Sequence, residues 1–580
     1  MTKRPQLVLG CSHKVLKYLE EFKSILGTKK WTLDSIVTEI DKLYCFLQET
    51  YSNEYVGRFA KIMKYGSTIK GAARHVATIL KISPLDVIFK SFSLISNLVL
   101  RQFQSQSFKK RDSKLYNPSD NFSPSMIEFF QEDKFYVSHS LDKNEFDYYL
   151  VLPKLTNNHP QFLISQYFCC FMLSCVFLRI IPKTTHAHVA NFFYNGQGME
   201  KCSVFLAYFV RMHDVLIRDS SSQPHNDFIL FSRSCCDTDC LKESLKTHKD
   251  KTFFFGESSL DPLQTRLSLQ PTDSLISTKL SKSSVVHDFA DKKVGGFVLQ
   301  AGAVQEETLL LAHTEAILAQ IMTHILDDSD SVLIHGASFL AYNSGWKKTF
   351  RFRGIIQRDL CERISIPSET FFHNTSRLGR GVDKDSNCAI FHANPTTGVC
   401  SFDWYNTSTV ISDLSSPLAS FGIYKTCIAV SDAKRYDSAC VKGQTEKSQI
   451  IREIQKCCAS FYIPPFLTQI TPSSQPKIEI CSGKWGAGVF KGSPCVKSIE
   501  MAIGAAINGV DLCLYGFGDE DCVSWWRRIF IAMNGKTIQN VLSVLTRYLR
   551  EDEGEEYDTR KDQEEAFVKC FSYLIDTPKK

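Results

Sequence analysis

The chain has 580 residues, of which 43% are hydrophobic and 22% are charged. This composition is typical of a globular protein rather than a disordered one. The length exceeds one ordinary core, so we expect roughly two to four domains. The formal net charge of +6 does not by itself predict a nucleic-acid partner, although it would not repel a polyanion.

Cysteine usage and the N-terminus favour an intracellular protein. The 21 cysteines are scattered without a disulfide framework, so we interpret them as reduced core residues. Cys235, Cys236 and Cys240 with His248 do not have the spacing of a known zinc-binding motif, which favours no metal. The N-terminus lacks the apolar run of a secretory signal. We therefore expect the protein in the nucleus, the cytoplasm or both.

Helical spacing of apolar residues marks the N-terminal part of the chain. The segments that show it are 15–26, 33–47, 87–100, 161–181 and 204–212. The apolar centre of the fourth segment, residues 167–178, is shorter than the roughly 20 residues that cross a membrane, so a buried helix explains it better. We predict an all-helical accessory domain over residues 1–225, ending in a loop at 219–224.

Beyond residue 225 the pattern changes to short apolar runs with helical segments between them. The runs are 228–231, 331–335, 426–430, 477–481 and 511–515, and the helical segments are 307–326, 447–460 and 496–508. Such runs fit strands buried on both faces. Their alternation with helices predicts an α/β domain over residues 226–545, with ligand-binding loops at the strand ends. The acidic residues that follow predict an exposed or flexible tail over 546–580.

One stretch of the α/β domain combines a glycine pair with an acid pair. Gly295 and Gly296 let a backbone pass close to a ligand, with its N–H groups free to bind an anion. Glu306 and Glu307, which follow Gln305, can take unequal environments, with one carboxyl protonated and the other ionised. Together they suggest chemistry on a sugar attached to a phosphate. On spacing alone, a capped and solvated helix start explains the acid pair equally well.

The complete stretch resembles a known signature. Asp-Phe-Ala at 288–290, Val-Gly-Gly at 294–296 and Gln-Glu-Glu at 305–307 resemble the signature of the poly(ADP-ribose) glycohydrolase family. Further segments are similar to those of the family in the same order, at 345–352, 428–433, 483–490 and 517–519. The resemblance implies a macrodomain-like α/β/α sandwich with a mixed sheet, preceded by an all-helical accessory domain.

The resemblance also implies an activity, the hydrolysis of ribose–ribose O-glycosidic bonds of poly(ADP-ribose) to release ADP-ribose, without a metal or other cofactor. Such cleavage needs a proton for the leaving oxygen and stabilisation of an oxocarbenium-like sugar. By family match, Glu307 would be the general acid and base, and Asp288 would join it as a catalytic residue. Glu306 would hold the ribose hydroxyls, and its charge would help to keep the proton on its neighbour.

The implied partners are poly(ADP-ribose) and poly(ADP-ribosyl)ated proteins, met by a monomer without nucleic-acid readout or membrane binding. The implied substrate-binding residues are Phe289, Asp291, Gly295, Gly296, Gln305, Trp346, Lys484, Gly486, Gly488 and Phe517. The glycines would cradle the diphosphate through backbone N–H groups, and Phe289 would pack against the ribose. Trp346 and Phe517 would offer aromatic faces near the adenine, where stacking is worth about 1–3 kcal/mol per base.

Four positions depart from the family pattern. Phe297 replaces a third glycine and Trp346 a tyrosine, while Asp291 and Lys484 each replace an asparagine. A phenylalanine cannot take a positive φ cheaply, and Asp291 places a carboxylate near an anionic ligand, which Lys484 could offset by meeting a phosphate. The alternative is therefore a protein of the same fold that binds ADP-ribose or its polymer with weak or no turnover. A segment from about residue 366 to 422 also resembles an insertion.

Overall fold

The computed structural model gives the arrangement of most of the chain. The residues that it describes are 6–11, 13–28, 30–51, 65–104, 109–110, 148–153, 155–156, 161–178, 180, 197–218, 227–256, 261, 263–270, 284–356, 363–367, 387–393, 400–406, 420–436, 444, 446–464, 477–551 and 559–577. The loop predicted at 219–224 lies outside these residues, as does part of the segment from 366 to 422. No described helix combines the length and the apolarity that crossing a membrane requires.

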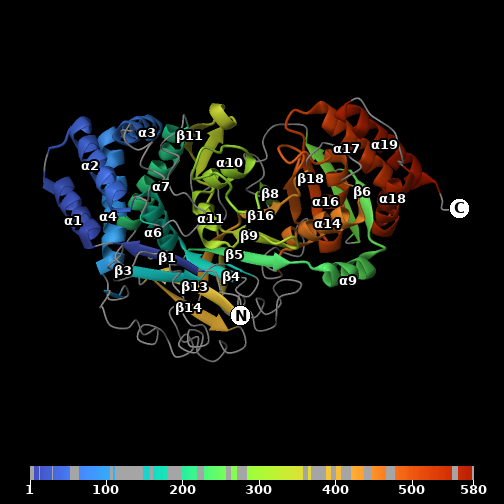
Figure 1. The fold of residues 1–580 in the computed structure, drawn as a ribbon, viewed down its shortest axis with the longest axis horizontal. Helices are drawn as coiled ribbons and strands as arrows, with labels where there is room; N and C mark the ends of the chain where they lie inside the picture. Colours follow the sequence, from blue (N-terminus) through green and yellow to red (C-terminus); the bar gives the residue numbers. More distant parts are fainter. Residues whose placement is uncertain are drawn as a thin grey trace.

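Helices pack together on the N-terminal side of the molecule, coloured blue to green in Figure 1. They are α1 (His13–Thr28), α2 (Leu33–Tyr51), α3 (Tyr65–Leu80), α4 (Pro84–Gln104), α6 (Gln166–Phe177) and α7 (Gly198–Arg218). Their apolar faces share a core that includes Leu19, Ile40, Val76 and Phe205. The predicted helical region is therefore confirmed. It is not purely helical, because β1 (Gln6–Cys11), β2 (Lys109–Lys110) and β3 (Tyr148–Pro153) form a small sheet beside it.

A mixed sheet of eleven strands runs through the middle of the described chain, in the order β14-β13-β4-β5-β9-β16-β8-β17-β18-β7-β6. Its strands are β4 (Gln161–Ser165), β5 (Phe228–Cys235), β6 (Thr252–Phe255), β7 (Gln264–Gln270), β8 (Ser284–Ala290), β9 (Asp330–His335), β13 (Asn387–Ala393), β14 (Cys400–Asn406), β16 (Cys427–Asp432), β17 (Glu479–Ser482) and β18 (Asp511–Tyr515). β16 is parallel to β8 and antiparallel to β9. All five apolar runs identified in the sequence are strands of this sheet.

Helices cover both faces of the sheet. Further elements are α9 (Thr238–His248), α10 (Gln305–Ala312), η4 (Thr314–Ile317), α11 (Leu318–Met322), β12 (Arg363–Pro367), α14 (Lys447–Ser460), β15 (Ser420–Tyr424), α16 (Pro494–Asn508), α17 (Glu520–Met533), α18 (Ile538–Glu551) and α19 (Arg560–Asp576). Ile428 and Val430 of β16 face a core shared with α10, α11 and the N-terminal helices. Cys427 and Ala429 face a second core shared with α14 and α16. This three-layer arrangement is the macrodomain-like sandwich that was expected.

Two predicted helices, at 161–181 and 307–326, need correction. Residues 161–165 form strand β4 rather than part of a helix, and α6 begins only where Ser165 caps the N–H of Phe168 at 3.2 Å. β4 pairs with β5, so the sheet crosses the domain boundary predicted at residue 225, which itself stays a prediction. The helix predicted over 307–326 is divided into α10, η4 and α11.

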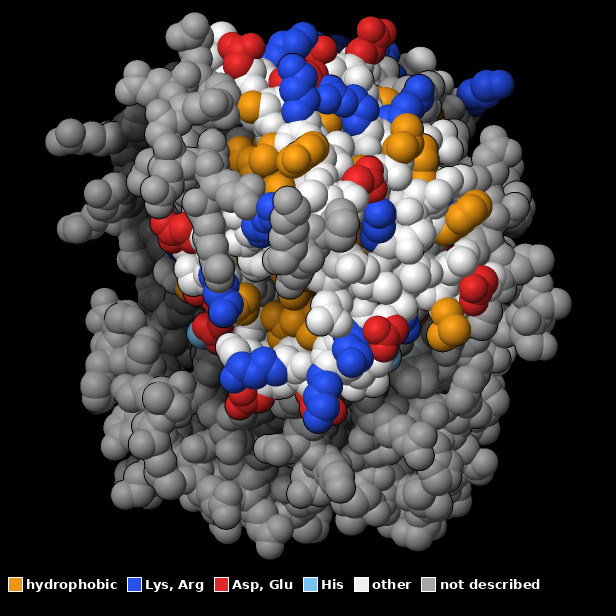
Figure 2. Space-filling view, turned by 90° about the vertical axis from the view of Figure 1, so that its right-hand side faces the viewer, with side chains coloured by type: hydrophobic (Ala, Val, Ile, Leu, Met, Phe, Trp, Pro, Cys, Tyr) orange, Lys and Arg blue, Asp and Glu red, His pale blue; other side chains and the backbone are white. Residues whose placement is uncertain are grey.

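Part of the predicted acidic tail, 546–580, is a packed helix. Helix α19 places Phe567 in full burial, and that ring packs edge-to-face on Tyr548 of α18 at 4.9 Å between centroids. Glu565 accepts a hydrogen bond from Arg528 of α17 at 2.6 Å. The acidic composition hid an apolar face, because apolar residues every three to four positions still bury a helix. Figure 2 shows the side of the molecule formed by these C-terminal helices, where acidic and basic side chains are interspersed over the described surface.

Candidate active site

The candidate site begins where strand β8 ends, near the centre of the molecule (Figure 1). β8 lies between β16 and β17 and runs parallel to both. After it, a series of tight turns leads to α10. We call residues 291–303 the first glycine loop. Residues 483–492, which follow β17, are called the second glycine loop. Because β8 and β17 are neighbouring parallel strands, both loops emerge at the same edge of the sheet.

Glu306 is buried, with 4% of its surface exposed, and its carboxylate accepts two backbone N–H groups of the first glycine loop. Oε1 accepts from Gly295 at 2.5 Å, and Oε2 accepts from Asp291 at 3.2 Å. Gly295 has a φ of 91°, and a Cβ at this position would lie 2.6 Å from the Cβ of Gln320. A glycine is therefore needed to bring this N–H group onto the carboxylate.

Glu307 is 3% exposed and binds the same loop further along. Its Oε1 accepts from the N–H of Phe297 at 3.0 Å, and its Oε2 accepts from the N–H of Val304 at 2.8 Å. Because Val304 directly precedes α10, Glu307 caps its own helix. The alternative explanation of the acid pair, a capped and solvated helix start, is thus right about the cap and wrong about the solvent.

Two glycines let the backbone approach these carboxylates closely. A Cβ at Gly296, where φ is 45°, would lie 2.5 Å from Oε2 of Glu306 and 2.8 Å from Oε1 of Glu307. A Cβ at Gly302 would lie 2.5 Å from the same Oε1 of Glu307. All three distances are shorter than real Cβ contacts, so a larger side chain at Gly296 would displace both carboxylates and one at Gly302 would displace that of Glu307.

The N–H groups of Gly295 and Gly296 do not have the role predicted for them. The N–H of Gly295 donates to Glu306, and the N–H of Gly296 donates to the carbonyl of Lys293 at 3.1 Å. Neither group is therefore available to a diphosphate in this structure. The first glycine loop uses its backbone donors to orient carboxylates instead.

Three carboxyl groups, those of Asp288, Glu306 and Glu307, share this buried region, and their negative charges repel one another. Asp288 is fully buried, and neither of its side-chain oxygens has a hydrogen-bond partner among the described residues. Burial, and then the charge of Glu307, raises the pKa of Asp288 well above its usual value. Burial, and then the charges of Asp288 and Glu307, also raises the pKa of Glu306. The charge expected on Glu306 is therefore disfavoured in the substrate-free protein, because desolvation outweighs its two backbone hydrogen bonds.

Gln305 ties the end of β8 to the start of α10. Its Oε1 accepts from the N–H of Phe289 at 2.8 Å, and its Nε2 donates to the carbonyl of His287 at 3.0 Å. The imidazole of His287 lies between the hydroxyls of Ser431 and Ser482, at 2.7 and 2.8 Å. Burial lowers the pKa of His287 to about 3, so this ring is a neutral structural link rather than a proton donor.

Aromatic residues from three segments converge beside the loops. Trp346 lies in the hairpin of β10 (Ala341–Ser344) and β11 (Arg351–Ile355), next to the short helix η5 (Lys347–Thr349). Its ring is edge-to-face with that of Phe517, 6.2 Å away between centroids. A Cβ at Gly483 would meet the rings of Phe517 at 2.6 Å and Phe289 at 3.4 Å. The structure therefore brings the three predicted aromatic residues into one region.

The second glycine loop keeps two of its glycine N–H groups free of acceptors among the described residues. The N–H groups of Gly486 and Gly488 have no acceptor among the described residues. Gly486 has a φ of 67°, and a Cβ there would lie 2.4 Å from the Cβ of Ala433. Lys484, predicted to meet a phosphate, pairs with Asp519 at 3.0 Å in this structure. The N–H of Ala487, which lies between them, donates to the carbonyl of Lys484 at 3.0 Å. Free backbone N–H groups in a tight turn form anion-binding concavities in other loops.

The two departures from the family pattern in the first glycine loop, Phe297 and Asp291, disturb the loop less than expected. Phe297 is not among the described residues with positive φ, because the left-handed positions fall on Gly295 and Gly296. Its ring is 58% exposed. The expected backbone strain at Phe297 is therefore wrong. Asp291 accepts the N–H of Lys293 at 3.0 Å, which turns its carboxylate to the loop's own backbone.

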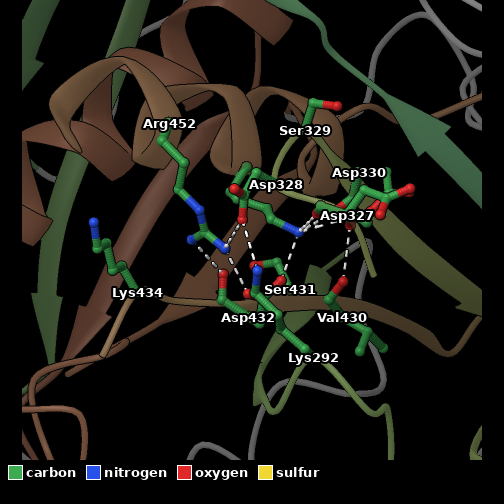
Figure 3. A network of polar contacts seen from close by, with 12 residues as sticks. Lys292, Asp327, Asp328, Ser329, Asp330, Val430, Ser431, Asp432, Lys434 and Arg452 are labelled. Carbon is green, nitrogen blue, oxygen red and sulfur yellow. Dashed lines mark hydrogen bonds and ion pairs between the residues drawn. The ribbon is translucent and has the colours of Figure 1, made fainter. Parts of the chain in front are cut away.

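Ion pairs join the first glycine loop to the sheet and to α14 (Figure 3). Lys292 pairs with Asp328 at 2.8 Å, and Asp328 also lies 3.4 Å from Arg452 of α14. Arg452 in turn pairs with the buried Asp432, the last residue of β16, at 2.5 Å. Asp432 belongs to a segment that resembles the family, and its role here is to anchor α14 at the end of its strand.

Two residues that sequence reasoning missed also bind the first glycine loop. Gln320 donates from Nε2 to the carbonyl of Gly296 at 2.8 Å. Lys201 of α7 donates to carbonyls further along the loop. The one signal for Lys201 was a lysine directly before an apolar helical run, which is more often a solvated helix start. Among the described residues, no group of three or more His, Cys, Asp or Glu side chains could hold a metal ion.

Comparison with known proteins finds similarity over the segments that contain the candidate site. Residues 257–368 and 394–524 match the family model described as poly(ADP-ribose) glycohydrolase (PARG), macro domain fold. Similar relatives include poly(ADP-ribose) glycohydrolases 2 and 1 of Caenorhabditis elegans, 24% identical over 234 residues and 22% identical over 350 residues. Poly(ADP-ribose) glycohydrolase 1 of Arabidopsis thaliana is 21% identical over 314 residues.

The matches cover part of each protein. They span 40%, 59% and 50% of this chain, and 37%, 34% and 51% of the three relatives, in the same order. The chain thus matches about a third to a half of the length of these relatives. The segments matched by the family model contain the acid pair and both glycine loops, whereas α7 lies outside them.

Proposed function

Because the chain belongs to the poly(ADP-ribose) glycohydrolase family, we propose that it hydrolyses the ribose–ribose O-glycosidic bonds of poly(ADP-ribose) and releases ADP-ribose. The observation that carries the proposal is the acid pair. Glu306 and Glu307 are buried, and glycine-enabled N–H groups hold both carboxylates in fixed orientations. A protein that only binds its ligand has no need of such an arrangement.

In this proposal Glu307 protonates the leaving ribose oxygen and then activates the attacking water. Its hydrogen bonds to Phe297 and Val304 set the direction of the carboxyl group. Glu306 holds the ribose hydroxyls, and its raised pKa lets its protonated form donate a hydrogen bond to one of them. Asp288, buried without a hydrogen-bond partner among the described residues, helps to raise the pKa of Glu306 and so favours its protonated form.

Substrate binding falls to the other side of the site. The free N–H groups of the second glycine loop, at Gly486 and Gly488, hold the diphosphate. Phe289 packs against the ribose, and Trp346 with Phe517 contacts the adenine. Phe517 has a φ of 53°, an uncommon backbone conformation for an aromatic residue and typical of functional sites. The expected partners are poly(ADP-ribosyl)ated proteins of the nucleus or cytoplasm, met by a monomer without a cofactor.

The binding-only alternative depended on Phe297 and Asp291. In the structure, Phe297 has an ordinary backbone conformation and still donates its N–H to Glu307. Asp291 likewise donates its N–H to Glu306. Both departures therefore preserve the contacts that orient the acid pair, which favours the hydrolase.

A direct assay tests the proposal. The full chain is incubated with labelled poly(ADP-ribose), beside Glu307→Gln and the control Glu243→Gln, whose side chain is exposed on α9. We expect release of ADP-ribose by the parent and the control, and loss of release in Glu307→Gln. Tight binding of the polymer by the parent without release would instead identify a binding protein.

A further inference from the structure

The first turn of α7 reaches from the helical region into the candidate site. Lys201 lies in this turn and is fully buried. Its Nζ donates to three backbone carbonyls of the first glycine loop, those of Val298 and Gln300 at 2.8 Å and that of Phe297 at 3.3 Å. An ammonium group has three donors, so this loop satisfies all of them.

Burying a lysine side chain is unfavourable, which makes this contact more than incidental packing. Burial lowers the pKa of Lys201 to about 7, and the nearby charge of Glu307 acts in the opposite direction. The ammonium therefore lies close enough to the acid pair to influence it electrostatically. The three carbonyls compensate for the lost hydration.

The contacts fix the peptide units around Phe297, the residue whose N–H donates to Glu307. Gln320 holds the carbonyl of Gly296, which belongs to the same peptide unit as the N–H of Phe297. That N–H donates to Oε1 of Glu307. Lys201 holds the next peptide units, through the carbonyls of Phe297 and Val298. Rotation of the Gly296–Phe297 unit would withdraw the N–H group from the carboxylate, and the two following units that Lys201 holds restrict this rotation.

The preceding residue extends the same support to the aromatic hairpin. Glu200 accepts from the N–H of Phe352 in β11 at 2.9 Å. The hairpin and the first glycine loop are also joined directly, because the N–H of Lys347 donates to the carbonyl of Ala303 at 2.7 Å. Two consecutive residues of α7 thus hold both segments that flank Glu307.

From this geometry we propose that Lys201 is a positioning residue for the hydrolysis: it holds the first glycine loop in the conformation that aims Glu307 at the scissile bond. The inference rests on the proposed function. It also gives the helical region a direct part in catalysis, from a helix outside the segments that match the family model.

The test compares the full-length parent with Lys201→Met, which keeps the length of the side chain and removes its donors. In Lys201→Met we expect faster deuterium exchange at the amides of residues 294–302. We also expect kcat for ADP-ribose release to fall by about 10²-fold, as for a catalytic group misplaced by about 1 Å. KM should change less than kcat, and the melting temperature should stay close to that of the parent.

The matched control is Lys90→Met. Lys90 lies on α4 and pairs at 2.7 Å with Asp214 of α7, the helix that carries Lys201. The control should keep both the exchange rates of the loop and kcat. A folded Lys201→Met protein with parental loop exchange and parental kcat overturns the proposal. If Lys201→Met does not fold, Lys201→Gln decides, because its amide is one atom shorter and has too few donors for the three carbonyls: lowered kcat with faster loop exchange supports the proposal, and parental values overturn it.

The two proposals fail in different ways. If the parent releases no ADP-ribose, the proposed function is wrong, while the deuterium exchange of the loop still decides whether Lys201 holds it. If the parent is active and Lys201→Met is equally active, only the positioning role is lost.

Discussion

The two glycine loops of the site look alike in sequence and differ in what their backbone donors do. In the first loop, the N–H groups of Gly295 and Phe297 are already bound to Glu306 and Glu307. In the second loop, those of Gly486 and Gly488 have no acceptor among the described residues. A glycine-rich sequence therefore predicts an unusual backbone conformation but does not predict what its N–H groups bind. We infer that the first loop serves the chemistry and the second serves the binding.

The supports beneath the loops differ as well. A buried lysine from the N-terminal helices, Lys201, holds the first loop by three carbonyls. The second loop is held by Arg560 of α19, which donates to the carbonyls of Ala487 at 3.1 Å and Gly492 at 2.7 Å. Each loop is thus anchored by a cation from a helix distant in sequence, α7 for the first loop and α19 for the second. The buried anchor belongs to the loop that must orient acids.

The largest effect should come from the acid pair. Glu307→Gln should lower kcat by about 10³-fold, within the range for loss of a general acid and base. ADP-ribose binding should be kept, because the second loop is untouched. Single-turnover release of ADP-ribose and calorimetric titration measure the two quantities separately. Equal loss of binding and turnover would mean that Glu307 holds the substrate rather than reacting with it.

A pair of matched substitutions tests the division of labour most directly. In Gly296→Ala, the new Cβ would lie within 3 Å of both carboxylates, so we expect kcat to fall by about 10²-fold with a smaller change in the dissociation constant. In Gly486→Ala, strain at a φ of 67° should move the free donors, so the dissociation constant for ADP-ribose should rise more than kcat falls. The same ratio of effects in both variants would contradict the distinction between the loops.

We propose that the aromatic residues bind the adenine. Trp346→Ala should weaken ADP-ribose binding by about 1–3 kcal/mol, the range for loss of one base–aromatic stack. Trp346→Phe keeps a ring and should recover most of the affinity. Calorimetric titration of both variants makes the comparison. Unchanged affinity in Trp346→Ala would place the adenine elsewhere.

Much of the fold and part of the candidate site could be predicted from the sequence, because the features concerned depend on residues close together in the chain. Continuous apolar runs such as 511–515 predicted buried strands, because alternate residues of those strands fill two cores. The resemblance of residues 288–307 to the family signature predicted that the glycine pair and the acid pair belong to one site, which their spacing alone left open. These features are local, so a short stretch of chain carries the complete signal.

The rest depends on contacts between distant segments. Lys201 and Phe297 are 96 positions apart, and spacing along the chain gives no sign of their contact. The engagement of the N–H of Gly295 by Glu306 could not be predicted either, because a free and an occupied donor have the same sequence. Strand β4 resembled a helix because it continues without a break into the buried helix α6.

The buried carboxyl groups predict a pH-dependent stability. The pKa of Asp288 is raised in the folded protein, so its contribution is fully present below the pKa of the unfolded chain. That contribution is lost as the pH rises through the folded pKa. Asp288→Asn should therefore raise the melting temperature more at pH 8 than at pH 5, by about 2 °C at pH 8. An equal shift at both pH values would show that Asp288 is not the titrating group.

The smallest effect should come from the anchor of the second loop. Arg560 is more than a third exposed on its side chain, and water can replace it at the carbonyls of Ala487 and Gly492. Arg560→Ala should weaken ADP-ribose binding by less than about 1 kcal/mol and leave kcat unchanged, as for other exposed charged contacts. Lys201 is fully buried, so solvent water does not replace its donors when Lys201→Met is measured beside Arg560→Ala. If the two substitutions lowered kcat equally, the burial of Lys201 would not explain why the first loop matters more for turnover than the second.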